Sequence, residues 1–556
     1  MRRFATLIVG LALASPLAVA PAGHGQEVCS WPMYQHDPGH SGAQSAACTA
    51  IEPGNVATLR PAWGLLTRDN MTASVVVADG IVYAGSWDGT FYAVDGETGS
   101  LLWTFTVDDP NRVAFGRIVS TASVGKVNVP GVGGVDAVLF GGGGTLYALA
   151  PGRVGPKVLA KIGVDPRTEE LRNQQASDPP QVEVESSPVV GHFPDGDRIY
   201  VGMDVHNDAH VGRTGLLAFG LRSNDGGTTP YRFELLYKFD PETGIVRHTL
   251  TDGSGTGWGC GGVWSSPVVA PAANGGNGVV AFGTSNCDNP SQSAAAGEIG
   301  REAMFGIDAT TGEELWRFQP RPVQDVDDDF GSSAQLLPGG AVGEGGKDGW
   351  YYARDAVTGA ARWSTRAAQA GHLNTGFAIG GFLGTGALGV ASDPVTGVAR
   401  PAVFACSAIP TPIGTPVDEG GNPLDASLLK DPARLFSLDA IDAQTGAILW
   451  RTPLALPCYG HVTYANGVVL ASVTFGFRIQ AFEAGTGLPL WLTPTFGAPS
   501  GAPVVVGDML YFGTGTRETD AEFKAFGDRI QTLVSGPLGE HPLSRLSGIF
   551  AYRLAP

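Results

Sequence analysis

The sequence predicts an all-β protein, an eight-bladed β-propeller of four-stranded antiparallel blades, and three observations support this. A unit made of an apolar strand, an Asp, a Gly four residues later and a Trp four residues beyond recurs along the chain, as in Asp95–Trp103. The composition, with 81 Gly, 39 Pro and 16% charged residues, suits many short strands joined by turns. One such hairpin cannot bury its own apolar faces, so we expect the copies to stack against one another.

Further copies of the unit follow along the chain. In each copy the acidic residue opens a tight turn, the Gly supplies the positive φ that other residues resist, and the Trp offers a wide surface for packing. Clear copies begin at Asp308, Asp355 and Asp442; weaker ones begin at Glu483 and at Asp240, where His248 stands at the position of the Trp.

The N-terminus is predicted to be a secretory signal peptide over residues 1–26, cleaved between about Ala20 and Gln26. Two arginines precede an apolar run that is short for a membrane span. We expect residues 27–58 to form an extension that drapes over the propeller, and residues 59–556 to form the propeller as a single domain. The mature protein is therefore expected to be secreted or periplasmic, with no membrane span after signal cleavage.

The cysteine content indicates the compartment in which the protein folds, and the net charge argues against two classes of partner. The chain has six cysteines, an even number that permits disulfides in an exported protein. No Cys-x-x-Cys-His motif occurs, so we expect no c-type haem on this chain. The net charge of −18 argues against nucleic acid or an anionic membrane as a partner. Sequence alone cannot choose the pairing, but pairing in chain order would join Cys29 to Cys48, Cys260 to Cys287 and Cys406 to Cys458.

The last blade is predicted to be completed by the N-terminus. Its own segment supplies three strands and no Trp motif, whereas Leu59–Leu66, which contains Trp63, is an unpaired strand ahead of the first blade. Pairing of that strand near Gly548–Ala551 would close the ring and remove an exposed sheet edge. Seven blades remain possible if one weak copy is only an insertion. The blades are assigned to residues 72–107, 117–164, 183–250, 263–318, 328–365, 371–454, 458–494 and 499–554.

Two charged segments outside the repeats could carry chemistry. Four carboxylates lie within Asp325–Asp329, immediately before the first strand of a blade. They form either a solvated acidic loop or a general base with cation ligands, since close like charges raise one another's pKa and a bound Ca²⁺ would offset the repulsion. Lys347 lies in a Gly-flanked turn before a strand, either as a solvated residue or as a cation that faces an anionic ligand.

Three further segments have both a structural and a functional interpretation. Asn286 follows an apolar strand, where its amide suits oxygen ligation of Ca²⁺ or a simple Asx turn. Gly261 and Gly262 precede Trp264, so a flat ligand could approach the backbone there and stack on the indole, unless the indole packs in the core. The segment Asp204–His210 holds two His and two Asp and could bind a transition metal or be a surface loop.

In these segments the chain resembles the quinoprotein alcohol dehydrogenases, and within them the polyvinyl-alcohol-dehydrogenase-like branch. The resemblance covers nearly the whole mature chain and is strongest over Trp31–Trp363. The repeat unit itself is shared with BamB-like assembly proteins, so it does not discriminate between the two. The matching segments are Trp31–Tyr34 with Asp37 and His40, Pro53–Trp63, Gly85–Gly89, Asp204–Asp208, Cys260–Pro267, Gly283–Cys287, Asp329–Ser332 and Gly346–Gly349.

The resemblance implies pyrroloquinoline quinone (PQQ) and Ca²⁺ on the propeller axis. Carried over by motif, Asp328 matches the catalytic aspartate and a Ca²⁺ ligand, with Asp327 or Asp329 as near alternatives. The glutamate that binds Ca²⁺ in the family has no clear copy in the third blade, where Asp208 or His210 falls near its place. The other matches are Asn286 as a Ca²⁺ ligand, Lys347 as the basic residue that faces the quinone, and Trp264 with Gly261 and Gly262 as the floor beneath it.

Two functions are therefore compared. The first is an exported dehydrogenase that oxidises alcohols, including secondary or polymeric ones, with PQQ and Ca²⁺, and passes electrons to a separate acceptor such as cytochrome c, since no cytochrome domain is fused. The second is a non-catalytic BamB-like propeller for protein binding or envelope assembly. A hydrolase that uses the acidic loop is disfavoured because no nucleophile motif accompanies it. The adjacent-cysteine disulfide of the methanol dehydrogenase type is also absent.

Overall fold

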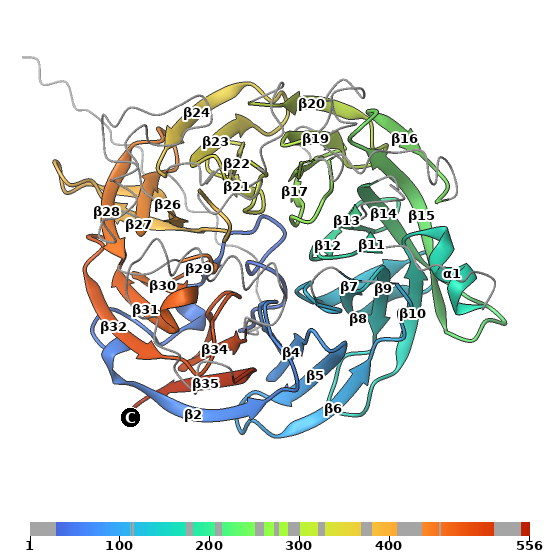
Figure 1. Ribbon diagram of the computed structural model, residues 1–556, viewed down its shortest axis with the longest axis horizontal. Helices are drawn as coiled ribbons and strands as arrows, with labels where there is room; N and C mark the ends of the chain where they lie inside the picture. Colours follow the sequence, from blue (N-terminus) through green and yellow to red (C-terminus); the bar gives the residue numbers. More distant parts are fainter. Residues whose placement is uncertain are drawn as a thin grey trace, which may run out of the picture.

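Eight β-sheets surround one axis in the computed structural model (Figure 1), which confirms the predicted eight-bladed propeller. Six sheets have four strands, the third has six and the seventh has five. Each sheet of the ring turns its faces to its two neighbours, so most apolar side chains are buried between blades. The structure describes residues 29–111, 113, 116–173, 182–205, 214–250, 261–271, 277–286, 301–320, 328–368, 381–408, 436–454, 458–515 and 546–556.

The first four blades follow in chain order. Blade 1 contains β3 (Val76–Ala78), β4 (Ile81–Gly85), β5 (Thr90–Asp95) and β6 (Leu101–Thr106). Blade 2 contains β7 (Ser123–Val129), β8 (Gly133–Gly142), β9 (Thr145–Leu149) and β10 (Val158–Gly163), and α1 (Pro166–Arg172) follows it. Blade 3 contains β11 (Val182–Glu183), β12 (Val189–Gly191), β13 (Arg198–Val205), β14 (Gly215–Ser223), β15 (Tyr231–Asp240) and β16 (Ile245–Arg247). Blade 4 contains β17 (Val268–Ala270), β18 (Val279–Gly283), β19 (Met304–Asp308) and β20 (Glu314–Phe318).

The other four blades complete the ring. Blade 5 contains β21 (Gln335–Leu337), β22 (Ala341–Gly345), β23 (Trp350–Asp355) and β24 (Ala361–Arg366). Blade 6 contains β25 (Ala387–Ser392), β26 (Ala399–Ala408), β27 (Phe436–Asp442) and β28 (Ile448–Leu454). Blade 7 contains β29 (Val462–Ala465), β30 (Val468–Val473), β31 (Arg478–Glu483) and β32 (Pro489–Pro494), with β1 (Ala43–Gln44) parallel to β29. Blade 8 contains β33 (Val504–Val506), β34 (Met509–Thr514), β35 (Gly548–Leu554) and β2 (Leu59–Leu66). Short 3₁₀ helices span Ala46–Cys48, Val56–Thr58 and Thr474–Gly476.

The ring closes through the N-terminal strand, as predicted. β2 pairs antiparallel with β35, with Trp63 opposite Ala551 and Leu65 opposite Ile549. The two strands lie side by side at the edge of the ring, next to the C-terminus (Figure 1). One strand from the start of the chain therefore supplies the outer edge that the last blade lacks.

Each Trp of the repeat unit docks on the next blade. The turn is held by its Asp, since Asp355 Oδ1 accepts the N–H of Thr358 at 2.9 Å, and Gly359 adopts a φ of +69°. A β-carbon at Gly359 would lie 2.6 Å from the indole of Trp316 in the preceding blade, so only glycine fits at this position. The indole Nε1–H of Trp316 also donates to the carbonyl of Ala356 at 3.0 Å. The same bond recurs for Trp63 to Gly96, Trp103 to Gly152, Trp363 to Ala443 and Trp450 to Ala484.

The third blade departs from the sequence expectation. The turn at Asp240 forms, with the N–H of Gly244 donating to the carbonyl of Asp240 at 2.8 Å. His248, however, is exposed and does not take the place of the Trp. Tyr237 does so instead, because its ring covers Gly312 and its hydroxyl donates to the carbonyl of Ala309 at 3.0 Å.

A closed ring of hydrogen bonds, here called the axial ring, runs around the propeller axis. One residue at the entry to each blade belongs to it, and its backbone N–H donates to the side chain of the next member at 2.8 to 3.1 Å. The side chain of Ala502 has no hydrogen-bond acceptor, so the N–H of His461 donates instead to the carbonyl of Ser500 at 3.2 Å. The N–H of Ala502 then donates to Ser74 Oγ at 2.8 Å. The members are Ser74, Thr121, Ser187, Ser266, Ser333, Thr385, His461 and Ala502.

Residues 31–44 form an N-terminal plug in the centre of the propeller, where the blue segment crosses the ring in Figure 1. Tyr34 hydrogen-bonds two members of the axial ring, with its hydroxyl 2.7 Å from Thr385 Oγ1 and 3.1 Å from Ser333 Oγ. Gln35 Nε2 donates to the carbonyl of Gly386 at 2.6 Å. Burial raises the pKa of Tyr34 to about 12, so its hydroxyl stays protonated in these bonds.

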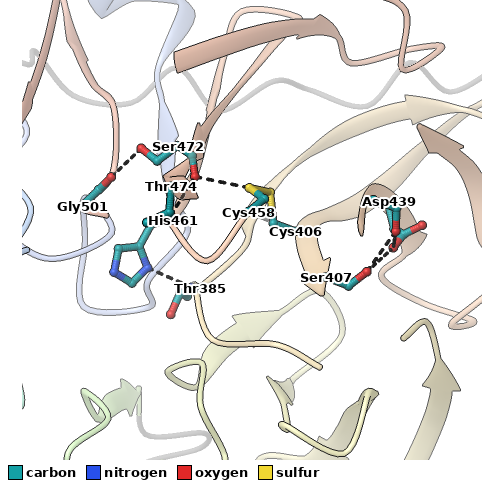
Figure 2. The surroundings of a disulfide bond; sticks show 10 residues. Thr385, Cys406, Ser407, Asp439, Cys458, His461, Ser472, Thr474 and Gly501 are labelled. Carbon is teal, nitrogen blue, oxygen red and sulfur yellow. Dashed lines mark hydrogen bonds between the residues drawn. A yellow bond between two sulfur atoms is a disulfide. The ribbon is translucent and has the colours of Figure 1, made fainter. Parts of the chain in front are cut away.

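Two disulfides lie within the described residues. Cys29–Cys48 fastens the N-terminal extension, and Cys406–Cys458 joins β26 of blade 6 to the entry of blade 7. Figure 2 shows the second bond next to His461, whose Nδ1 accepts the N–H of Thr385. Both pairs were expected from chain order, whereas Cys260 and Cys287 lie outside the described residues. Disulfides of this kind fit an oxidising compartment.

The described part of the chain holds one α-helix, α1, which has seven residues. None of its helices has the length and apolar character that crossing a bilayer requires.

Deleting residues 27–66 should destabilise the whole propeller. The deletion removes β2 and the plug, so it exposes the edge of β35 and the axial ends of blades 5 to 7. We expect scanning calorimetry to show loss of the single cooperative transition, while removal of Ala555 and Pro556 leaves it intact. A shift of only a few degrees in Tm would contradict the closure.

Acid should loosen the plug through two buried histidines. Burial lowers the pKa of His40 and His461 to about 4, and repulsion from His40 adds to the effect on His461. The unfolded chain therefore binds more protons than the folded chain below pH 6.5, and stability is lost as pH falls from 6.5 towards 4, by about 3 kcal/mol per histidine.

Urea unfolding at a series of pH values measures this loss. His461→Gln retains an acceptor for the N–H of Thr385 but cannot be protonated in this range. The free energy of unfolding of this variant should therefore fall less steeply as pH is lowered. His248→Gln, at an exposed histidine, serves as the control. Equal slopes in wild type and His461→Gln would exclude His461 as a source of acid sensitivity.

Candidate functional site

The candidate site lies where the chain enters blade 5, next to the end of β18 in blade 4. Asp329 Oδ1 accepts the backbone N–H of Asn286 at 2.8 Å, and its Oδ2 accepts from Lys347 Nζ at 3.0 Å. Both members of the ion pair are buried, with 4% of Asp329 and 8% of Lys347 exposed. A buried carboxylate and a buried ammonium are thus held together beside the Asn286 backbone.

A Gly-flanked turn between β22 and β23 positions Lys347. Gly349 adopts a φ of +81°, and the N–H of Gly346 closes the hairpin by donating to the carbonyl of Trp350 at 2.9 Å. The N–H of Lys347 donates to the carbonyl of Asp329 at 2.8 Å, which ties the turn to the acidic segment. Lys347 Nζ lies 5.8 Å from the centre of the Trp264 ring, within the range of a cation–π contact.

The glycines before Trp264 allow a close approach of chain segments. Gly261 has a φ of +71°, and its carbonyl accepts from Thr214 Oγ1 at 3.1 Å. A β-carbon at Gly262 would lie 1.8 Å from Asp204 Oδ1 and 2.6 Å from Ser285 Oγ. Gly262 is therefore required for the buried carboxylate of Asp204 to reach this place.

Asp328 has different neighbours from Asp329. It is 1% exposed, and its backbone N–H donates to Glu302 Oε1 at 2.8 Å. Glu302 is fully buried and adopts a φ of +43°, and Arg301 beside it is 1% exposed. The structure therefore places Asp328 with Glu302, and Asp329 with Lys347.

The structure brings some of the predicted site residues close together, and others lie outside the residues that it describes. The structure brings together Asp329, Asn286, Lys347, Trp264, Gly261 and Gly262. Asp328, the predicted catalytic residue, contacts Glu302 instead. Asp208, His210 and Asp327 lie outside the described residues. Asp204 was anticipated only as part of a cluster, and Arg301 and Glu302 were missed. The one signal for that pair in the sequence was two charged residues directly before an apolar strand.

The donor atoms of the site suit a hard cation and a flat ligand. Within the described ranges no group of three or more His, Cys, Asp or Glu side chains is placed to hold a metal ion. The carboxylates of Asp329 and Asp204 and the Asn286 amide are oxygen donors of the kind that Ca²⁺ takes. The bare backbone at Gly261 and Gly262 next to an indole suits a planar ring system.

A polar cavity of about 240 Å³ lies against Trp264 and the axial ring. Hydroxyls of the axial ring line it, together with His461 of that ring and Tyr34 of the plug. The cavity is also lined by three residues that each stand two positions before a member of the axial ring: Glu185, Trp264 and Tyr459. Trp264 therefore lines this cavity and is also within cation–π range of Lys347.

Solved structures share this architecture. A europium-containing methanol dehydrogenase superposes with a TM-score of 0.64 over 95% of this chain and 98% of its own, at 17% identity. The chain has the quinoprotein alcohol dehydrogenase fold. Quinohemoprotein alcohol dehydrogenases from Pseudomonas putida HK5 and Comamonas testosteroni give TM-scores of 0.62 and 0.59, at 17% and 18% identity, each over 94% of this chain and 80% of theirs. The resemblance read from the motifs is thus confirmed at the level of the fold.

Sequence comparisons agree with a repeat of this type. A family model described as outer membrane protein assembly factor BamB matches residues 54–202 and 436–545. The curated lupanine 17-hydroxylase [cytochrome c] of Pseudomonas sp is 24% identical over 339 residues, which are 56% of this chain. The chain spans 44% of the length of that relative. The family model leaves out the central blades, where the candidate site lies.

Breaking the buried ion pair should cost more than removing it. Lys347→Met leaves Asp329 as a buried charge without its counterion, so we expect a loss of about 3–5 kcal/mol in the free energy of unfolding. The double variant Lys347→Met with Asp329→Asn removes both charges and should recover most of that loss. Urea denaturation measures both, and a single variant as stable as wild type would show that the pair does not form.

Proposed function

We propose that this protein is a PQQ-dependent dehydrogenase that oxidises alcohols outside the cytoplasm. The observation that supports it most is the buried pair of Asp329 and Lys347 beside Asn286 and Trp264, on a propeller with the quinoprotein dehydrogenase fold. A scaffold has no evident need for buried opposite charges at this place, because burial costs both ions their hydration. An enzyme needs a base and a cation in a site from which water can be excluded.

The residues present fit the cofactors that the fold family implies. Trp264 would form the floor under the quinone ring, with the bare backbone of Gly261 and Gly262 alongside. Asn286 and Asp329 would supply oxygen ligands for Ca²⁺, with Asp328 and Asp208 as the further ligands that the motif suggests. PQQ supplies the acceptor for the electrons of the alcohol when it is bound.

The side chains divide the remaining work. Asp329 would receive the hydroxyl proton of the alcohol, because it is the carboxylate held next to Lys347 and Asn286. Lys347 neutralises the charge of Asp329 and presents a cation towards Trp264, where an anionic ligand would lie. Asp328, the residue favoured by the motif, is the alternative base; its contact with Glu302 favours a role in fixing the segment.

The partners follow from the same proposal. The alcohol could be secondary or polymeric, as in the branch that the motifs resemble. Electrons would leave to a separate acceptor such as cytochrome c, in line with the cytochrome c in the name of the lupanine hydroxylase. Two disulfides in the described residues support a secreted or periplasmic location, and we propose that residues 1–26 act as the signal for export.

A non-catalytic, BamB-like role in protein binding or envelope assembly is the second candidate. The family model over residues 54–202 and 436–545 favours it. Those residues carry the repeats that both classes share, whereas Asn286, Asp329 and Lys347 lie between the two matched ranges. The residues of the central blades therefore favour the dehydrogenase over the BamB-like role.

Reconstitution with PQQ and Ca²⁺ tests the proposal. The expected result is quinone absorption that stays with the protein after gel filtration, and alcohol-dependent reduction of a dye. Asp329→Asn should keep the quinone absorption and lose turnover by about 10²–10⁴-fold, as expected for a missing general base. Asp328→Asn, at the alternative base in the same segment, is the comparison variant.

The outcomes separate the hypotheses. Full turnover in Asp329→Asn with loss in Asp328→Asn would assign the base to Asp328. A wild-type protein that binds no quinone and reduces no dye with primary, secondary or polymeric alcohols would exclude the enzyme and leave the assembly role.

A further inference from the structure

One buried carboxyl group breaks the pattern of the inner strands. In every blade the second residue after the axial-ring member pairs with a residue of the next strand. The residue that follows this partner points between blades. In blade 5 that residue is Glu344 of β22. The other seven blades carry buried apolar residues there: Ala84, Phe140, Val201, Phe282, Ala405, Ala471 and Phe512.

Glu344 lies in a place without polar partners. It is 0% exposed, and neither carboxyl oxygen has a hydrogen-bond partner in the part of the chain that the structure describes. A β-carbon at Gly283 would lie 2.3 Å from Glu344 Oε1 and 2.4 Å from Phe330 Cβ. Glu344 and Phe330 therefore share the space that the missing side chain of Gly283 leaves open.

Among the described residues, the neighbours that contact this carboxyl are neutral. Gly283 of β18 and Phe330 of the entry segment carry no titratable group. The titratable side chains on which it acts are Tyr34 of the plug and Tyr351 of β23. The Tyr351 hydroxyl donates to Gln335 Oε1 at 3.0 Å, and Tyr34 is held by the axial ring. Within the described ranges a negative charge on Glu344 would have no counterion, and burial raises its pKa well above the usual range.

We propose that Glu344 is a positioning residue for the ion pair of Asp329 and Lys347, and that it does this as a neutral carboxylic acid. Phe330 follows Asp329 directly in the chain, so the packing of Phe330 over Gly283 sets where Asp329 lies. A neutral Glu344 is compatible with that packing. An ionised Glu344 must draw in water or move away, which displaces Phe330 and with it Asp329.

The pH dependence has a definite sign. The folded state keeps the proton of Glu344 and the unfolded state releases it above the ordinary pKa of 4.5. The stabilisation is complete below pH 4.5 and is lost as pH rises towards the folded pKa. Relative to a variant without this proton, the unfolding equilibrium constant of wild type should rise about tenfold for each pH unit in that window. This inference concerns the folded chain and does not depend on the proposed oxidation.

Infrared spectroscopy of the full-length protein tests the protonation state. The difference spectrum between wild type and Glu344→Gln at neutral pH should contain the carbonyl band of a protonated carboxylic acid. Glu313→Gln, which removes an exposed carboxyl, should give a carboxylate band instead. A carboxylate band for Glu344 at neutral pH would overturn the proposal.

Hydrogen–deuterium exchange tests the positioning role. The amides of Asn286, Phe330 and Lys347 all bond within this segment, so their protection reports its geometry. In wild type their protection factors should fall as pH rises, while Glu344→Gln and Glu344→Ala hold them constant. Ala is the residue of three other blades at this position, so at least one neutral variant is expected to fold. Equal pH dependence in wild type and the neutral variants, or pH-independent protection in all three, would overturn the proposal.

Discussion

The axial ring is the interaction on which the rest of the molecule depends. Each blade donates one backbone N–H to its neighbour, and the last bond returns from Ala502 to Ser74, so no blade can shift along the axis without breaking two bonds. These bonds are buried, and a buried N–H without a partner is costly. The blades are thus held at one level near the axis, and the docked Trp residues hold them at the rim.

The site inherits its geometry from this ring. Trp264 stands two residues before Ser266, and Asp329 stands four residues before Ser333. Both ring members are fixed by their neighbours on either side, so the short segments that lead into them have little freedom. Lys347 is joined to the same segment through the carbonyl of Asp329. A base, a cation and an aromatic floor can therefore meet although they come from two blades.

Repetition explains how much of this could be predicted from the sequence. Turn residues and Trp spacing repeat, so the eight blades and the closure by Trp63 follow from local chemistry and from the missing strand. Individual roles do not repeat. Tyr237 of β15, and not His248, takes the place of the Trp. Asp329 and Asp328 differ in which neighbour they contact. The role of Glu344 could not be predicted from a motif, because the space it occupies depends on Gly283, a residue 61 positions away in another blade.

The closing strand has a consequence for the order in which the protein is made. Residues 59–66 are synthesised long before residues 548–554, with which they pair. The Tyr34 plug likewise waits for the entries of blades 5 and 6. Until residues 548–554 have been synthesised, β2 has no partner strand and the ring has a gap. If the chain is exported as proposed, the ring would close only after residues 548–554 have crossed the membrane.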